Sequence, residues 1–168
     1  MIFVTVGTQL PFERLIKAVD LWAENNPEIK VVAQIGQTVY QPKFMTTLES
    51  VDPDVYERYL LQSRLVVGHV GMGTIISGIK HGKSLVLMPR VANLGEHRND
   101  HQLASAKQFG TLSGVHIVHD QAELESAINQ VLSPDVPDDM CNELNVSAGL
   151  IKRISDFVKE TQNEYRHN

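Results

Sequence analysis

The chain has 168 residues, of which 42% are hydrophobic and 21% are charged, and its formal net charge is −5. This length suits one domain with a sizeable core. The acidic balance, and the lack of any long run of Lys or Arg in the sequence, argue against a nucleic-acid partner. Cys141 is the single cysteine, so an internal disulfide is excluded and a reducing compartment is indicated.

The first residues form a short apolar run without the basic residues that begin a signal peptide, so we expect a buried strand there. No stretch approaches the roughly 20 apolar residues that a membrane span requires. The sequence therefore predicts a cytoplasmic protein that reaches a membrane only through a partner.

Short apolar runs alternate along the chain with segments of helical periodicity. The runs lack polar alternation, as in strands covered on both faces. Asp52-Pro53 and Asp120 are typical of helix starts. In chain order we expect a strand over residues 2–6, a helix from Phe12, a strand over 31–35, a short strand with a loop within 38–50, a helix over 52–62, a strand over 65–68, a helix over 73–80, a strand over 84–88, a helix over 99–109, a strand over 115–118 and a helix over 120–132.

This alternation predicts an α/β fold, a single Rossmann-like open parallel sheet with helices on both faces. Right-handed crossovers place the loops that follow the strands at one edge of the sheet, where such sheets bind ligands. We expect residues 1–132 to form this domain. Residues 133–168 are expected to form a turn-rich linker and a helix over 144–158 that docks on a partner.

The sequence Gly-Met-Gly-Thr at residues 71–74 follows an apolar strand and opens a helix. Free backbone N–H groups and the helix dipole attract phosphate there, and glycine lets a ligand approach closely. The segment is neither GxxxxGK[ST] nor GxGxxG, which argues against a P-loop and a dinucleotide site. A tight turn that needs glycine only for packing is the alternative. We expect four residues at the ends of the first two strands to line the same cleft, namely Gly7, Thr8, Gln34 and Gly36.

The loop after residues 84–88 supplies polar side chains that could recognise a second part of the ligand. A phosphate-binding turn together with such a loop is typical of a nucleotide-sugar site. His101 and Gln102 at a helix start are expected to face sugar hydroxyls; a solvated charged face is the alternative. Arg90 is expected to meet a phosphate or carboxylate, or else to form a surface salt bridge. His69, just before the glycine turn, is either a general base or donor or a partly buried histidine that shapes the turn.

His97 and His101 are four residues apart and would share one face of a helix. Together with Glu96 they raise the possibility of a metal-dependent hydrolase. Because the sequence offers no clear third ligand, we expect no metal site.

Four segments in this order, FVTVGTQLPFERLI, VVAQIG, VVGHVGMGTIISGIKHGKSLVLMPR and GEHRNDHQLASA, carry a family resemblance. Together they resemble the donor-binding half of GT-B glycosyltransferases of the MurG type, the family 28 C-terminal domain. The resemblance covers about residues 1–132 and is greatest to stand-alone subunits of the PssE type, which act in exopolysaccharide and capsule synthesis.

The resemblance implies a UDP-sugar donor as substrate, no cofactor, and metal-independent, inverting transfer of a hexose to a lipid-linked saccharide. It also implies a membrane-anchored subunit that binds the acceptor. The diphosphate would lie at Gly71, Met72, Gly73 and Thr74, and the sugar near Arg90, Glu96, His101 and Gln102. Ser77 stands where a ribose-binding glutamate is usual, which leaves ribose recognition open. A non-enzymatic nucleotide-sugar-binding subunit is the alternative function.

Overall fold

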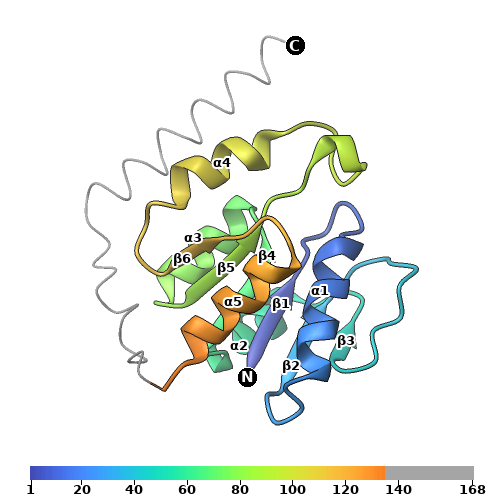
Figure 1. The fold of residues 1–168 in the computed structure, drawn as a ribbon, viewed down its shortest axis with the longest axis vertical. Helices are drawn as coiled ribbons and strands as arrows, with labels where there is room; N and C mark the ends of the chain where they lie inside the picture. The colour runs from blue at the N-terminus through green and yellow to red at the C-terminus, as the bar shows by residue number, and fades with distance from the viewer. Residues whose placement is uncertain (135–168) are drawn as a thin grey trace.

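The computed structural model describes residues 1–134 and confirms the predicted α/β fold. Six strands form one parallel sheet in the order β3-β2-β1-β4-β5-β6 (Figure 1). The strands are β1 (Ile2–Thr5), β2 (Val31–Gln34), β3 (Thr46–Leu48), β4 (Leu65–His69), β5 (Ser84–Met88) and β6 (Val115–Ile117). The helices are α1 (Glu13–Glu24), α2 (Pro53–Gln62), α3 (Met72–Lys80), α4 (His101–Phe109) and α5 (Gln121–Leu132), with a 3-10 turn η1 (Ala92–Leu94) before α4.

The strands and helices within residues 1–134 lie where the sequence predicts them, and the differences are at their ends. The largest is at α4, which begins at His101 rather than at residue 99. There the Asp100 carboxylate accepts a hydrogen bond from the Ala92 N–H at 2.9 Å, which holds the preceding residues in the loop. The helix predicted over residues 144–158 lies outside the described residues.

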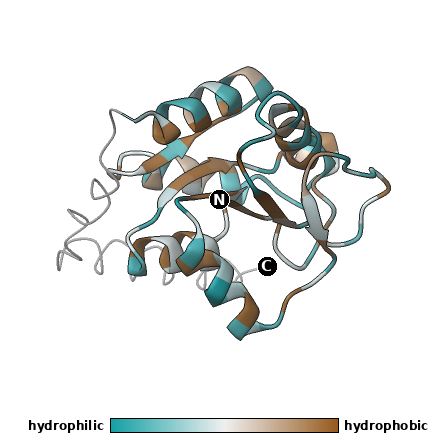
Figure 2. Ribbon diagram, turned by 90° about the horizontal axis from the view of Figure 1, so that it is seen from below, coloured by the Kyte–Doolittle hydropathy of each residue, from teal (hydrophilic) through white to brown (hydrophobic). Residues whose placement is uncertain are grey.

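Both faces of the sheet are covered by helices. Because strand side chains alternate between faces, Leu65 and Val67 of β4 belong to the core under α1 and α5. Val66, between them, packs into the core under α2, α3 and α4. Figure 2 shows apolar strands at the centre and helices that carry both apolar and polar residues. This two-sided burial explains why the strand sequences lack polar alternation.

The strand order reverses at β1, which is hydrogen-bonded to β2 on one side and to β4 on the other. In open α/β sheets a crevice forms at such a switch point, beyond the carboxyl ends of the strands. β1 leads into the loop that contains Gly7, and β4 leads into Gly71. The fold therefore brings the two glycine segments of the sequence to one place.

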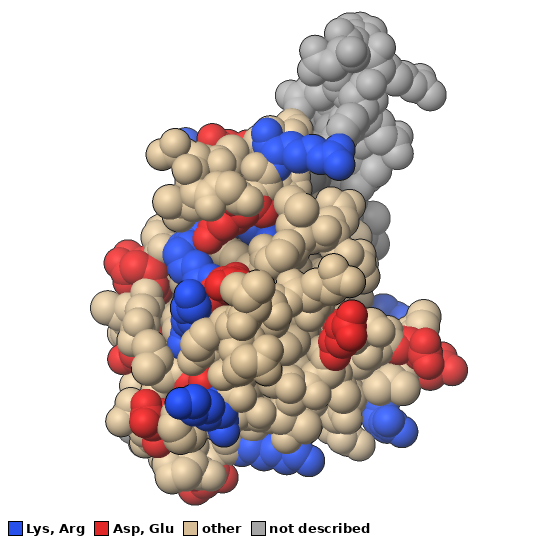
Figure 3. Space-filling model, turned by 90° about the vertical axis from the view of Figure 1, so that its right-hand side faces the viewer, with Lys and Arg blue, Asp and Glu red and all other residues tan. Residues whose placement is uncertain are grey.

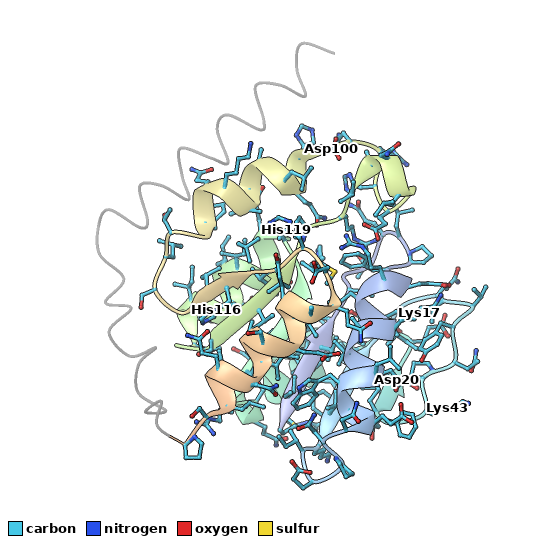
Figure 4. The ribbon with its side chains drawn as sticks, in the orientation of Figure 1. Lys17, Asp20, Lys43, Asp100, His116 and His119 are labelled. Carbon is cyan, nitrogen blue, oxygen red and sulfur yellow. The ribbon has the colours of Figure 1, made fainter. Side chains whose placement is uncertain are left out.

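The loop between β2 and β3 is held to α1 by the buried carboxylate of Asp20. It accepts hydrogen bonds from the Tyr40 hydroxyl at 2.8 Å and from the backbone N–H groups of Lys43 and Phe44 at 2.9–3.1 Å (Figure 4). A loop with little regular structure is thereby fixed against α1 just before β3 begins.

No helix within residues 1–134 combines the length and the apolar character that crossing a membrane requires. On the face shown in Figure 3, Lys and Arg are interspersed with Asp and Glu.

Candidate functional site: a cavity at the switch point

A cavity of about 480 Å³ lies at the carboxyl ends of β1 and β4. This volume is in the range of small-molecule sites. Its wall combines the loop after β1, the start of α3, the loop after β3 and the segment after β5. Ten of the predicted site residues line it: Gly7, Thr8, Gln34, His69, Gly71, Met72, Gly73, Thr74, Arg90 and Gln102. Ser77 and His97, which the sequence analysis also named, line it as well.

The start of α3 presents free backbone donors to this cavity. The first N–H groups of a helix have no intrahelical partner, and Gly71, the N-cap residue, has no side chain to bond them. The Gly71 N–H itself donates to the His69 carbonyl at 2.8 Å. The N–H groups of Met72, Gly73 and Thr74 remain for a ligand, at the positive end of the helix dipole.

Gly73 is not explained by packing within the protein. A β-carbon at this residue would have no heavy atom within 4 Å among its described surroundings, and the residue is exposed. Glycine costs a helix about 1 kcal/mol relative to alanine. The missing side chain instead leaves the backbone open to close approach from the cavity.

Gly7 and Gly71 are explained by packing, since the His69 ring lies between them. A β-carbon on Gly71 would collide with Nε2 of His69, and one on Gly7 would be 2.8 Å from Cε1 of the same ring. Gly7 also has a φ of +77°, which favours glycine. This geometry supports the histidine that shapes the turn, one of the two predicted roles of His69.

Burial lowers the pKa of His69 to about 4, and the positive charge of Arg90 acts in the same direction, against a smaller opposing effect of the Thr5 backbone. The ring is therefore neutral at neutral pH. Its Nδ1 is buried and has no hydrogen-bond partner among the described residues. A general base works best with a pKa near the working pH, so these properties argue against the base role predicted for His69.

Arg90 is buried rather than on the surface, so the predicted surface salt bridge is wrong, while the predicted ligand contact stays a prediction for this cavity-lining residue. Its side chain is 3% exposed and lies 4.5 Å from the centre of the Phe12 ring. Both terminal nitrogens are already used, because they donate at 2.6–3.1 Å to four backbone carbonyls, those of Val6, Leu10, Pro11 and Glu96.

The two glutamines of the cavity differ in what they leave for a ligand. Gln34 uses its whole amide internally: Oε1 accepts from the Thr5 hydroxyl at 3.0 Å, and Nε2 donates to the carbonyls of Gly7 and Glu49. It shapes the cavity wall. Gln102 accepts one hydrogen bond from the Arg90 N–H at 3.1 Å through Oε1, and its NH₂ group remains for a ligand.

Two of the residues predicted at the sugar, Glu96 and His101, are not among the cavity-lining residues. The Glu96 carboxylate is bound to the Arg14 guanidinium by two hydrogen bonds of 2.8 Å. Gly36, predicted in the nucleotide site, lines an adjoining cavity of about 340 Å³ that shares Gly7 with the first.

The sequence reasoning missed the loop after β3 and the start of α2, which supply Ser50 and Val51, and Pro53 and Tyr56, to the cavity. The rule that strand C-termini meet at one edge pointed to this loop, but it contains no glycine motif to draw attention.

Within residues 1–134, no group of three or more His, Cys, Asp or Glu is placed to hold a metal ion. Glu96 is bound to Arg14, and Nδ1 of His97 lies 3.2 Å from both oxygens of Asn99. The hydrolase hypothesis, built on Glu96, His97 and His101, therefore finds no support in the described part of the chain.

The chain matches the model of the glycosyltransferase family 28 C-terminal domain over residues 1–161. It belongs to this family. No curated protein sequence matches the chain. Solved structures share the fold of this family 28 domain, with identities of 20% or less.

Three of these structures come from glycosyltransferases. The glycotransferase of kitacinnamycin is 20% identical, with a TM-score of 0.64, over 91% of this chain and 43% of that one. MurG of Acinetobacter baumannii is 16% identical, with a TM-score of 0.62, over 94% of this chain and 49% of that one. UDP-glucose: anthocyanidin 3-O-glucosyltransferase in complex with UDP is 14% identical, with a TM-score of 0.65, over 94% of this chain and 39% of that one. The family 28 domain described here thus spans less than half the length of each.

Proposed function

We propose that this domain binds the nucleotide-sugar donor of a glycosyltransferase, with the donor diphosphate at the start of α3. The observation that carries the proposal is the exposed, unobstructed Gly73 beside unpaired N–H groups in the wall of the switch-point cavity. Helix starts of this kind bind phosphate groups. No carboxylate is among the described residues that line the cavity, so nothing there repels a diphosphate.

The donor that we propose is a UDP-hexose. The support is family membership together with the fold shared with a glucosyltransferase solved in complex with UDP. We propose that the NH₂ group of Gln102, which lines the same cavity, bonds an oxygen of the donor sugar.

The reaction that we propose is inverting transfer without a metal. The bond between the anomeric carbon and the UDP oxygen breaks as an acceptor hydroxyl oxygen bonds that carbon from the opposite side, and the hydroxyl proton passes to a base. Negative charge grows on the leaving UDP, and the N–H groups of Met72, Gly73 and Thr74 stabilise it. Because the pKa of His69 is lowered to about 4, we assign the base to the acceptor-binding half.

We further propose that the acceptor site lies on a separate membrane-anchored chain, which presents a lipid-linked saccharide and recruits this domain to the cytoplasmic face of the membrane. The support is the resemblance of the four sequence segments to stand-alone donor-binding subunits of exopolysaccharide and capsule synthesis. The non-enzymatic alternative, a subunit that only binds nucleotide sugar, fits the same cavity.

A panel of nucleotides tests the donor assignment. Calorimetry and thermal unfolding with UDP, UDP-glucose, UDP-galactose, UDP-glucuronate, UDP-N-acetylglucosamine and dTDP should show binding of UDP and selective binding of one UDP-sugar. Ligand at 100 times its Kd would stabilise the fold by about 2.7 kcal/mol. Failure of every nucleotide to bind would overturn the proposal.

A measurement of sugar transfer distinguishes the enzymatic function from the non-enzymatic alternative. The domain and its membrane partner together should transfer labelled sugar to lipid-linked acceptor, and Gln102→Ala should abolish the transfer while the domain stays folded. Tight UDP-sugar binding without any transfer by the complex would favour the non-enzymatic alternative.

A further inference from the structure

We propose that Arg90 is a positioning residue. It sets the shape of the loop after β1 and the orientation of Gln102. It thereby sets the distance between the two walls of the donor site that these elements form. This inference rests on the proposed donor site and concerns a residue whose two terminal nitrogens are bonded to carbonyls of the protein itself.

The first wall is residues 6–11, which follow β1 without regular hydrogen bonding. Three carbonyls of this stretch converge on the Arg90 guanidinium: Val6 at 2.7 Å, Leu10 at 2.6 Å and Pro11 at 2.6 Å. Gly7 and Thr8, which line the cavity, lie between the held residues. One side chain, about 80 residues away in sequence, therefore fixes both ends of the loop.

The second wall is Gln102 on α4. The backbone N–H of Arg90 donates to Oε1 of Gln102, which fixes that amide with its NH₂ group available to the cavity. The guanidinium also donates to the Glu96 carbonyl at 3.1 Å, in the segment that leads from β5 to α4. Main chain and side chain of one residue thus reach both walls.

The geometry requires arginine. A planar fork reaches four acceptors at once and packs flat on an aromatic ring, here Phe12 at 4.5 Å, whereas lysine has three donors on one atom. Burial lowers the pKa of Arg90 to about 10, so the group keeps its charge at neutral pH despite its 3% exposure. A cation buried this deeply is costly unless it is well bonded, and here backbone carbonyls and the Phe12 ring surround it.

The test is a double-mutant cycle between Arg90→Lys and Thr8→Ala, read as the Kd for UDP. Arg90→Lys keeps a positive charge and loses the fork, and we expect Kd to rise at least tenfold. Thr8 is exposed in the cavity, and Thr8→Ala should weaken UDP binding in the wild-type background but add little once Arg90 no longer holds the loop. Ile128→Val, in the α5 core, is the control for lost stability, and it should lower the thermal midpoint without changing Kd.

Hydrogen exchange of the ligand-free protein gives a reading that does not depend on UDP. The amides of residues 7–10 and 96–102 should exchange faster in Arg90→Lys, while those of α5 do not change. If Arg90→Lys fails to fold, Phe12→Leu, which removes the ring beneath the guanidinium, should give the same changes in weaker form.

Wild-type affinity for UDP in Arg90→Lys would overturn the inference, as would a Thr8→Ala effect that is fully additive. Unchanged exchange in the two segments would also overturn it. If the wild type itself binds no nucleotide while the exchange result holds, the positioning role stands and the donor-site proposal fails.

Discussion

The imidazole of His69 occupies the space that a β-carbon on Gly71 would fill, and a β-carbon on Gly7 would lie 2.8 Å from Cε1 of the same ring. The two glycine segments therefore meet at one partly buried histidine. This contact joins the ends of β1 and β4 at the switch point.

Gly71→Ala should be destabilising, because its β-carbon would collide with the His69 ring, which is also packed closely against Gly7. We expect a loss of about 1–3 kcal/mol in the free energy of unfolding, measured by urea titration. In the background of His69→Ala the same substitution should cost much less, since the space is then empty. Equal costs in the two backgrounds would show that the contact does not matter.

Stability should fall as the solution is acidified from about pH 6.5 to about pH 4. The pKa of His69 is about 4 in the folded state and near 6.5 in the unfolded chain, so the unfolded state takes up the proton first. The loss from this residue amounts to about 3 kcal/mol by pH 4. Burial lowers the pKa of His116 as well, which adds in the same direction.

Urea titrations at half-unit pH steps check this expectation. His69→Gln should flatten the decline. An identical pH profile for wild type and His69→Gln would contradict the buried, neutral ring.

Gln34→Leu should cost about 2 kcal/mol, because it removes the internal amide that bonds the buried Thr5 hydroxyl and the carbonyls of Gly7 and Glu49. Gln37→Leu, the same change at an exposed glutamine three residues later, is the control and should change stability by less than about 0.5 kcal/mol. Similar values for the two variants in urea titration would show that the internal amide contacts add no stability.

Asp20→Asn should loosen the loop between β2 and β3. The amide keeps one acceptor oxygen and loses the charge, so the bonds to Tyr40, Lys43 and Phe44 weaken at a cost of about 2 kcal/mol. Hydrogen exchange should be faster for the amides of Lys43 and Phe44 and unchanged in α5. Unchanged exchange at these two amides would argue against the anchor.

The fold was predictable because its signals are local. Apolar runs without alternation mark strands buried on both faces, and the spacing of apolar residues marks the helices between them. The start of α4 was misplaced because the Asp100 carboxylate, bonded to Ala92 eight residues earlier, decides where the helix begins.

The backbone part of the site was predictable for the same reason, since a glycine-rich helix start after a strand is visible in the sequence. The side chains were harder. Arg90 and Glu96 look like ligand contacts in the sequence, yet both are bound by partners about 80 residues away, carbonyls in one case and Arg14 in the other. Partners so far apart in the sequence can be identified only in the folded structure, where the loops lie side by side.

The central claim is that a nucleotide diphosphate lies against Gly73, and a matched pair of variants tests it. Gly73→Val places a side chain in open space at the second residue of α3, and Ala122→Val makes the corresponding change at the exposed second residue of α5.

The measurement is calorimetric titration of UDP into wild type and the two variants, with circular dichroism to confirm folding. We predict that wild type and Ala122→Val bind UDP with the same Kd and that Gly73→Val, equally folded, loses binding by at least a hundredfold. Wild-type affinity in Gly73→Val would contradict the donor site at the start of α3.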